Sequence, residues 1–361
     1  MLYHFLLPLQ SYFSPFRLIR YITFRGALAI ALSFLICVLM GPVFIRMLKK
    51  WNIKQFVRDE GPKAHQVKTG TPTMGGLLIL TAVVVSTLLF IRWNTPFFWI
   101  LLFVTLAFGG IGFLDDYLKM RRRKNLGLTS RQKFVLQIAA ATAVAVFLYV
   151  YARAGPYETT LTVPFFKNFR PELGLWFIPF AVLVVVGSSN AVNLTDGLDG
   201  LAIGSTLIAA ATYTVLSYAA GNAIISNYLD IPNVKGAGEL AVFAAALVGA
   251  SMGFLWYNAH PAQVFMGDVG SLALGAAIGT LALIVKESLL LVIVGGLFVI
   301  EALSVILQVG SYRWRKKRIF RCAPIHHHFE LGGWAETQVV IRFWILALLF
   351  SLLGLATLKL R

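Results

Sequence analysis

The amino-acid sequence predicts an all-α integral membrane protein with about ten transmembrane helices. Hydrophobic residues make up 58% of the 361 positions, and the mean hydropathy is +0.77. This composition excludes an ordinary soluble domain. Long apolar runs must be helical, because lipid offers backbone groups no hydrogen-bond partners. The strands of a transmembrane barrel would be shorter and would alternate in polarity.

Ten apolar runs of about spanning length follow one another along the chain. They cover residues 27–47, 75–91, 97–114, 134–152, 173–189, 201–220, 239–256, 271–285, 288–309 and 341–359. No internal repeat or low-complexity tract separates them, so residues 1–361 are expected to form a single polytopic membrane domain. The N-terminal region shows no secretory signal, which predicts that the first long helix is an uncleaved anchor.

Basic residues are unevenly shared between alternate connections, and this asymmetry predicts the topology. The first, third and ninth connections carry six, seven and six Lys and Arg residues. The second, fourth, sixth and eighth carry one, three, one and one. By the positive-inside rule, the odd connections are cytoplasmic and both termini are periplasmic. The formal charge of +17 then belongs to loops beside anionic lipid, and no nucleic acid partner is expected.

Acidic residues are scarce and gather at a few helix ends. The chain has 15 acidic and 32 basic residues, and five of its seven aspartates fall in three clusters. Counting helices places all three clusters, and a run of three histidines, on odd connections and therefore on the cytoplasmic face. Carboxylates at a membrane surface can hold a magnesium ion beside phosphate groups. The clusters are Asp115-Asp116, Asp196 with Asp199, and Asp268.

The pair Asp115-Asp116 closes the third apolar run. Two adjacent carboxylates repel each other, and at a helix C-terminus they also face the negative end of the macrodipole. A cation must compensate them. The candidates are a divalent metal ion or the neighbouring basic residues Lys119 and 121–123.

Four amide and carboxylate side chains recur every third residue after the fifth run. In an ideal helix each step of three turns by about 60°, so four such residues wrap half way round. No single lipid-facing helix could hide them, and the glycines among them favour a broken helix or a loop. Capping and turn chemistry explain one or two of the four, and ligand binding explains the set better. The four residues are Asn190, Asn193, Asp196 and Asp199.

Several further polar residues lie at helix ends or within a span. Asp268 stands between glycines and could be either a ligand-binding residue or the N-cap of the eighth span. Glu301 lies at membrane depth, where an acid is either functional or a helix-packing residue. The three histidines lack a spacing that completes a zinc site, so hydrogen bonding or pairing with phosphate is more plausible. The two cysteines, Cys37 and Cys322, have no metal-type spacing, and no disulfide is expected.

Five sequence blocks taken together resemble those of a known enzyme family. The blocks, in order, are TPTMGG at 71–76, DDY at 115–117, NAVNLTDGLDGLA at 190–202, FMGDVGS at 265–271 and APIHHH at 323–328. They are similar to those of the phospho-N-acetylmuramoyl-pentapeptide-transferases, within the polyprenyl-phosphate N-acetylhexosamine-1-phosphate transferases. The resemblance runs from about residue 20 to the C-terminus.

The resemblance implies a magnesium-dependent phosphoglycosyl transfer. Phospho-MurNAc-pentapeptide would pass from UDP-MurNAc-pentapeptide to undecaprenyl phosphate, giving lipid I and UMP for peptidoglycan synthesis. The resemblance also implies a homodimer in the bacterial cytoplasmic (inner) membrane. By motif, Asp115, Asp116 and Asp268 become the catalytic acids and magnesium ligands, Asp268 first among them. The implied substrate-binding residues are Lys68, Thr73, Lys133, Asn190, Asn193, Asp196, Asp199, His326, His327 and His328.

The residues alone leave other chemistries open. An ion-coupled transporter would also use membrane acids, but near the midplane and between repeated halves. A lipid-diphosphate phosphatase, or another polyprenyl-phosphate sugar-1-phosphate transferase, would use a similar face and metal. For the transferase, the second pKa of a lipid phosphate is about 6, so the acceptor needs no strong general base. Direct attack by the lipid phosphate is therefore favoured over a route through an aspartyl-phosphate.

Overall fold

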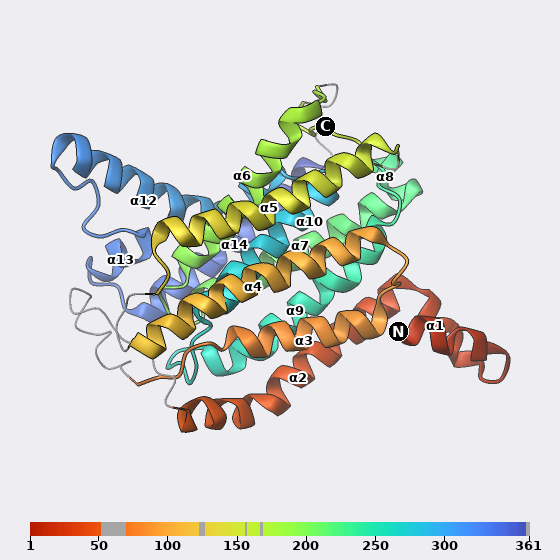
Figure 1. Ribbon diagram of the computed structural model, residues 1–361, viewed down its shortest axis with the longest axis horizontal. Helices are drawn as coiled ribbons and strands as arrows, with labels where there is room; N and C mark the ends of the chain where they lie inside the picture. Colours follow the sequence, from red (N-terminus) through yellow and green to blue (C-terminus); the bar gives the residue numbers. More distant parts are fainter. Residues whose placement is uncertain (52–69, 123–126, 156, 167–168, 359–361) are drawn as a thin grey trace.

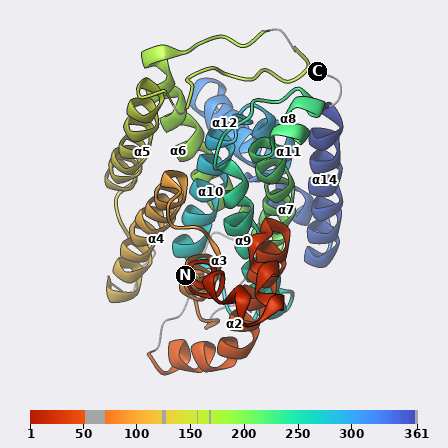
Figure 2. The ribbon, with the colours of Figure 1, turned by 90° about the vertical axis from the view of Figure 1, so that its right-hand side faces the viewer.

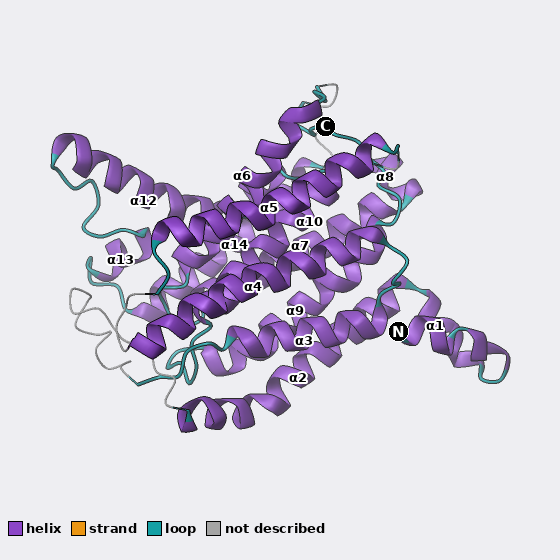
Figure 3. Cartoon of the chain, in the orientation of Figure 1, coloured by secondary structure: helices purple, strands orange, loops and turns teal. Residues whose placement is uncertain are grey.

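A computed structural model describes residues 1–51, 70–122, 127–155, 157–166 and 169–358. Within these ranges the chain forms helices and no named strand (Figure 3), which confirms the predicted all-α class. One isolated antiparallel bridge joins Thr160 to Glu172. The α-helices are α1 (Leu2–Leu6), α2 (Ile22–Lys50), α3 (Gly76–Phe90), α4 (Pro96–Arg122), α5 (Ser130–Arg153), α6 (Phe177–Thr195), α7 (Leu201–Gly221), α8 (Ala223–Leu229), α9 (Leu240–Asn258), α10 (Gly267–Ile284), α11 (Leu290–Val294), α12 (Gly296–Arg315), α13 (Ile325–Glu330) and α14 (Glu336–Thr357). Short 3-10 helices cover Pro8–Ser11, Ser14–Arg20, Gly174–Trp176 and Ala237–Glu239.

Each of the ten predicted apolar runs contains a helix, but two runs differ from the expectation. Nine of the described helices are long and apolar enough to cross a membrane, which supports a multi-pass membrane protein. The second run forms α3, which has only 15 residues. The ninth run is divided into α11 and α12 at Gly295, because glycine is a poor helix former.

Helix α10 lies at the centre of the bundle (Figure 2). All of its residues after Asp268 are buried, and they are mostly alanine, glycine and leucine. Apolar side chains suit either lipid or neighbouring helices, and their complete burial shows that other helices surround α10. Helices α3, α4, α6 and α7 pack against α10, so its first residues are held at a defined place among their ends.

Glycines allow the neighbouring backbones to approach α10 directly. A Cβ at Gly112 of α4 would collide with the carbonyl group of Asp268. A Cβ at Gly76 of α3 would collide with the backbone of Gly270. Small residues permit this close approach between membrane helices. The contact at Gly112 places the end of α4 beside the start of α10.

The polar ends of these helices share one end of the bundle. The C-termini of α2, α4 and α12 and the N-termini of α5 and α10 lie toward the left of Figure 1. The last turns at this end carry basic residues, such as Lys49 and Lys50 of α2 and Arg313 of α12. The acid clusters and the basic connections are therefore at the same end, as counting helices predicts.

The opposite end is closed by a buried ion pair. Arg25 of α2 donates to both carboxylate oxygens of Glu239, with Nη1–Oε2 at 2.6 Å and Nη2–Oε1 at 2.7 Å. Arg92 approaches the same carboxylate, with Nε 3.3 Å from Oε1. Arg25 and Glu239 therefore neutralise each other inside the bundle, and Arg92 adds a second, partly exposed positive charge.

Replacement of Gly112 by alanine should destabilise the protein, because the added Cβ forces α4 away from α10. Gly110→Ala is the matched control, since a Cβ at Gly110 meets nothing within 4 Å. Alanine is favoured over glycine in helices by up to about 1 kcal/mol, so Gly110→Ala should be neutral or stabilising. Thermal unfolding in detergent would measure both. A Gly112→Ala variant that melts at or above wild type would show that the contact is not needed.

Candidate active site at one end of the bundle

Three buried or partly buried carboxylates meet where α4 ends and α10 begins. Asp115 and Asp116 lie in the last turns of α4, and Asp268 lies in the first turn of α10. Each of the three offers an oxygen that lies within 4.8 Å of the others' oxygens. The N-terminus of α10 favours the negative charge of Asp268, whereas the C-terminus of α4 disfavours those of Asp115 and Asp116.

Two lysines offset this repulsion. The Nζ atom of Lys119 lies 2.6 Å from Asp115 Oδ2, 3.5 Å from Asp116 Oδ1 and 3.0 Å from Asp268 Oδ2. The Nζ atom of Lys133, on α5, lies 2.8 Å from the same oxygen of Asp268. Three carboxylates and two ammonium groups leave a formal charge of −1, so the group still attracts a cation.

Hydrogen bonds from the backbone and from α6 orient the carboxylates. The amide of Leu128 donates to Asp115 Oδ1 at 2.7 Å, and that of Val269 donates to Asp116 Oδ2 at 3.3 Å. Asn193 donates to Asp268 Oδ1 at 2.8 Å and to the hydroxyl of Ser271 at 2.8 Å. The carboxylates are thus held in place before any ligand binds.

The residues present fit a magnesium ion. Magnesium prefers oxygen ligands, binds through few carboxylates and keeps several waters. Asp115, Asp116 and Asp268 supply such oxygens within reach of one another, with an uncompensated negative charge. Asp268 has exposed surface on its side chain, so the group opens toward the end of the bundle.

The four polar residues that recur after the fifth apolar run have different partners in the structure. Asn193 joins the carboxylates through Asp268. Burial, together with the charges of Asp268, Asp116 and Asp199, raises the pKa of Asp196 well above its usual range. Asn190 instead donates to Gln137 of α5 at 2.8 Å, and Asp199 belongs to another cluster.

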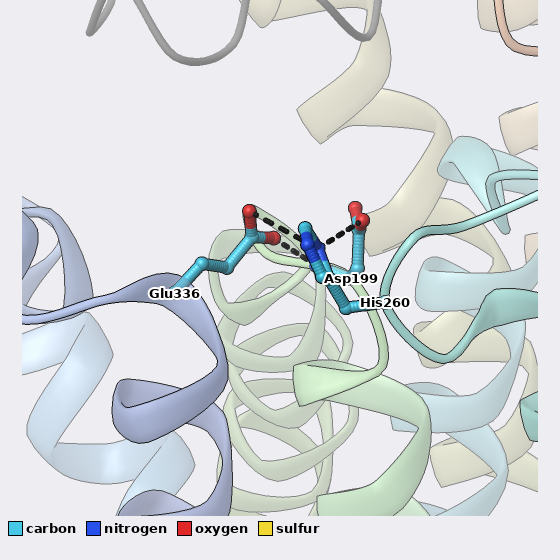
Figure 4. Close-up of side chains that lie close together, drawn as sticks. All are labelled: Asp199, His260 and Glu336. Atoms are coloured by element: carbon cyan, nitrogen blue, oxygen red, sulfur yellow. Dashed lines mark hydrogen bonds and ion pairs between the residues drawn. The ribbon is translucent and has the colours of Figure 1, made fainter.

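Asp199 forms a second cluster with His260 and Glu336 (Figure 4). His260 Nδ1 lies 3.1 Å from Asp199 Oδ2 and 3.6 Å from Glu336 Oε2. The backbone amide of Asp199 donates to Glu336 Oε1 at 2.9 Å, and the amide of Ala262 donates to Asp199 Oδ2 at 3.1 Å. The cluster ties the α6–α7 and α9–α10 connections to the start of α14.

The three consecutive histidines have three different partners. His326 Nδ1 lies 3.1 Å from Glu301 Oε1, and both side chains are fully buried. His327 Nδ1 lies 2.7 Å from Glu330 Oε2 in a partly exposed pair. His328 Nδ1 accepts from the backbone amide of Arg321 at 3.1 Å. Successive helical residues point in different directions, so this divergence follows from the geometry of α13.

Of the other predicted site residues, Thr73 is near the carboxylates and Lys68 lies outside the described residues. A Cβ at Gly267 would lie 3.0 Å from Thr73 Oγ1, close to Asp116. Sequence reasoning considered Lys119 only as a neighbouring neutraliser, and it missed His260, Glu336 and Gln137. The spacing of Lys119 from the two aspartates, three and four residues along one helix, was the available signal.

Two family models match segments of this chain that contain site residues. Residues 98–286, from α4 to just past α10, match the model for glycosyl transferase family 4. Residues 68–80 match the phospho-N-acetylmuramoyl-pentapeptide-transferase signature 1, and this segment includes Lys68 and Thr73.

Full-length relatives carry the same family name. A phospho-N-acetylmuramoyl-pentapeptide-transferase of Koribacter versatilis is 55% identical, with 97% of this chain and 96% of the relative covered. One of Pelobacter propionicus is 54% identical over the whole of both chains. One of Acidobacterium capsulatum is 56% identical over all of this chain and 99% of the relative. The chain belongs to the phospho-N-acetylmuramoyl-pentapeptide-transferase family.

Membership of this transferase family explains which residues the bundle gathers. The segment matched by the family model contains Asp115, Asp116 and Asp268, with Lys133 and Asn193 between them. The three aspartates form ion pairs with Lys119, and both Lys133 and Asn193 contact Asp268. The transferase motifs thus converge on one group although they lie far apart in the sequence.

Removal of the Lys119 charge should leave the three carboxylates under-compensated. We expect Lys119→Gln to lower stability by about 1 kcal/mol, a few degrees in Tm, because the lysine is partly exposed. Millimolar magnesium should restore part of this loss. Arg121→Gln, on the same helix turn, is the control and should melt like wild type. An unchanged melting curve for Lys119→Gln without magnesium would contradict the compensating role.

Proposed function

We propose that the chain transfers phospho-MurNAc-pentapeptide from UDP-MurNAc-pentapeptide to undecaprenyl phosphate, giving lipid I and UMP. The observation that carries the proposal is the joined group of Asp115, Asp116, Asp268, Lys119 and Lys133 at one end of a membrane bundle. One substrate is soluble and the other is a lipid. A site at the end of the bundle can meet both, whereas a transporter site near the midplane could not.

The proposal includes the side of the membrane on which the site lies, the membrane itself and a homodimeric assembly. The acid clusters lie at the end that carries the basic connections, and the positive-inside rule makes this end cytoplasmic. UDP-sugars are made in the cytoplasm, so this side suits the soluble substrate. Assignment to the bacterial inner membrane follows from the peptidoglycan reaction, and the homodimer rests on the family resemblance.

The side chains suit a diphosphate and a phosphate acceptor. Lys119 and Lys133 are placed to contact phosphate oxygens, and Asn193 holds Asp268 in orientation. Asp115, Asp116 and Asp268 would hold magnesium. When bound, magnesium supplies positive charge against the oxygens of the diphosphate and of the leaving UMP.

The transfer itself is a substitution at the sugar-side phosphorus. An oxygen of the lipid phosphate forms the new bond to this phosphorus, and the bond to the oxygen that bridges to the nucleotide phosphate breaks. The bridging oxygen leaves with UMP. Much of the lipid phosphate is already dianionic at neutral pH, because its second pKa is about 6. Asp115 and Asp116 then position the reacting groups without acting as nucleophiles.

The proposal predicts that Asp268→Asn abolishes turnover without unfolding the bundle, because the loss of this carboxylate weakens the binding of magnesium. The measurement is UMP release from purified protein given both substrates and magnesium. Asp230→Asn is the control, since Asp230 pairs with Arg170 away from the site. Wild-type rates in a folded Asp268→Asn variant would remove this residue from the mechanism.

The direct route predicts that no phosphorylated protein accumulates when the lipid phosphate is omitted. The experiment is a single turnover with UDP-MurNAc-pentapeptide and magnesium, followed by mass analysis of the intact protein. Direct transfer gives neither an adduct nor a burst of UMP. A covalent adduct on Asp115 or Asp116 that forms and decays as fast as turnover would establish the two-step route instead.

A further inference from the structure

Glu301 and His326 form a buried pair outside the carboxylate group. Glu301 projects from α12 and His326 from α13, and both are 0% exposed. One oxygen of Glu301 lies 3.1 Å from His326 Nδ1. Each side chain has a second polar atom, Glu301 Oε2 and His326 Nε2, which has no hydrogen-bond partner within the described part of the chain.

The chemistry of the pair fixes how the imidazole is used. The short contact between Glu301 Oε1 and His326 Nδ1 holds one shared proton, because a hydrogen bond needs a donor. Burying a net charge is costly, so burial favours a pair without net charge, which has a further proton on the imidazole. The ring then presents a second N–H at Nε2. Such a carboxylate–histidine pair is a common way to orient an imidazole toward a ligand.

The unpartnered nitrogen lies against the α6–α7 loop. A Cβ at Gly197 would collide with His326 Nε2, so only glycine lets this loop pass the edge of the ring. Gly197 follows Asp196, whose carboxylate lies close enough to Asp268 and Asp116 to feel their charges. His326 Nε2 therefore lies beside the turn that borders the carboxylate group.

The other two histidines do not share these features. His327 pairs with Glu330 at a partly exposed position, and His328 accepts a backbone hydrogen bond. Only His326 combines full burial, a buried carboxylate behind the ring and an unpartnered nitrogen directed at the loop. The sequence left Glu301 either a functional or a helix-packing residue. Its contact with His326 favours the functional interpretation.

We propose that Glu301 is a positioning residue that holds His326 so that Nε2–H donates to a phosphate oxygen of the bound nucleotide. This inference rests on the proposed function, because it takes the nucleotide diphosphate as the ligand. Glu301 does not touch the substrate. Its carboxyl group orients the imidazole through Nδ1, and hydrogen bonds to a charged phosphate are the stronger kind.

The experiment compares the binding of UMP and uridine by calorimetry. The variants are Glu301→Gln, His326→Gln and the double variant. Glutamine at 301 can still accept from Nδ1 but carries no charge. We expect Glu301→Gln and His326→Gln each to weaken UMP binding about tenfold while uridine binding stays unchanged. The double variant should bind UMP no worse than His326→Gln, because Glu301 acts through His326.

Glu330→Gln is the matched control, since it removes the same charge from a neighbouring carboxylate–histidine pair. It should bind UMP like wild type. The inference is overturned if Glu301→Gln keeps wild-type UMP affinity, if UMP and uridine weaken equally, or if the losses add in the double variant. An equal loss in Glu330→Gln would overturn it as well. Wild-type protein that binds UMP but transfers nothing would count against the proposed function alone, and protein that binds neither ligand would end both.

Discussion

Repulsion between three carboxylates is the constraint on which the rest of this structure depends. Asp115, Asp116 and Asp268 are brought within 4.8 Å of one another by helices whose backbones touch at Gly112. Cations that lie close by stabilise such a group. Lys119 and Lys133 supply two charges, and the remaining negative charge fits a divalent ion beside a diphosphate.

The middle of the bundle is used for packing, and the helix ends carry the polar groups of the candidate site. Helix α10 is buried along its whole length after Asp268, so the middle of the protein is an apolar packing region. Charged and amide side chains are concentrated at the helix ends, where they can form hydrogen bonds between one loop and another. The Asp199–His260–Glu336 cluster and the Glu301–His326 pair each connect the C-terminal helices to the α6–α7 loop region. Both contacts can keep that loop in register with the carboxylates.

Hydropathy predicted the helices well because lipid leaves the backbone no alternative. Counting helices also placed Asp115, Asp116 and Asp268 at a common end. Helix lengths were less predictable, since α3 is short and the ninth run breaks at Gly295. These differences depend on how neighbouring helices pack, which a hydropathy profile does not contain.

The partners of individual site residues were the hardest feature to predict. The three-residue spacing of Asn190, Asn193, Asp196 and Asp199 indicated a shared ligand, but Asn190 turns to Gln137 of another helix. Asp199 pairs with His260, which lies 61 residues away in the sequence. Rotation of each helix about its axis decides such pairings, and it is set by contacts across the bundle. The family motifs identified candidate site residues, but they did not indicate which of these residues contact one another.

The most direct test of the carboxylate group is the binding of Mn²⁺, a spectroscopic substitute for magnesium, measured by electron paramagnetic resonance. A single site per chain is predicted in the wild-type protein. Asp268→Asn should lose this site, and Asp115→Asn and Asp116→Asn should weaken it. Wild-type Mn²⁺ affinity in all three folded variants would contradict the claim that these carboxylates together hold the metal.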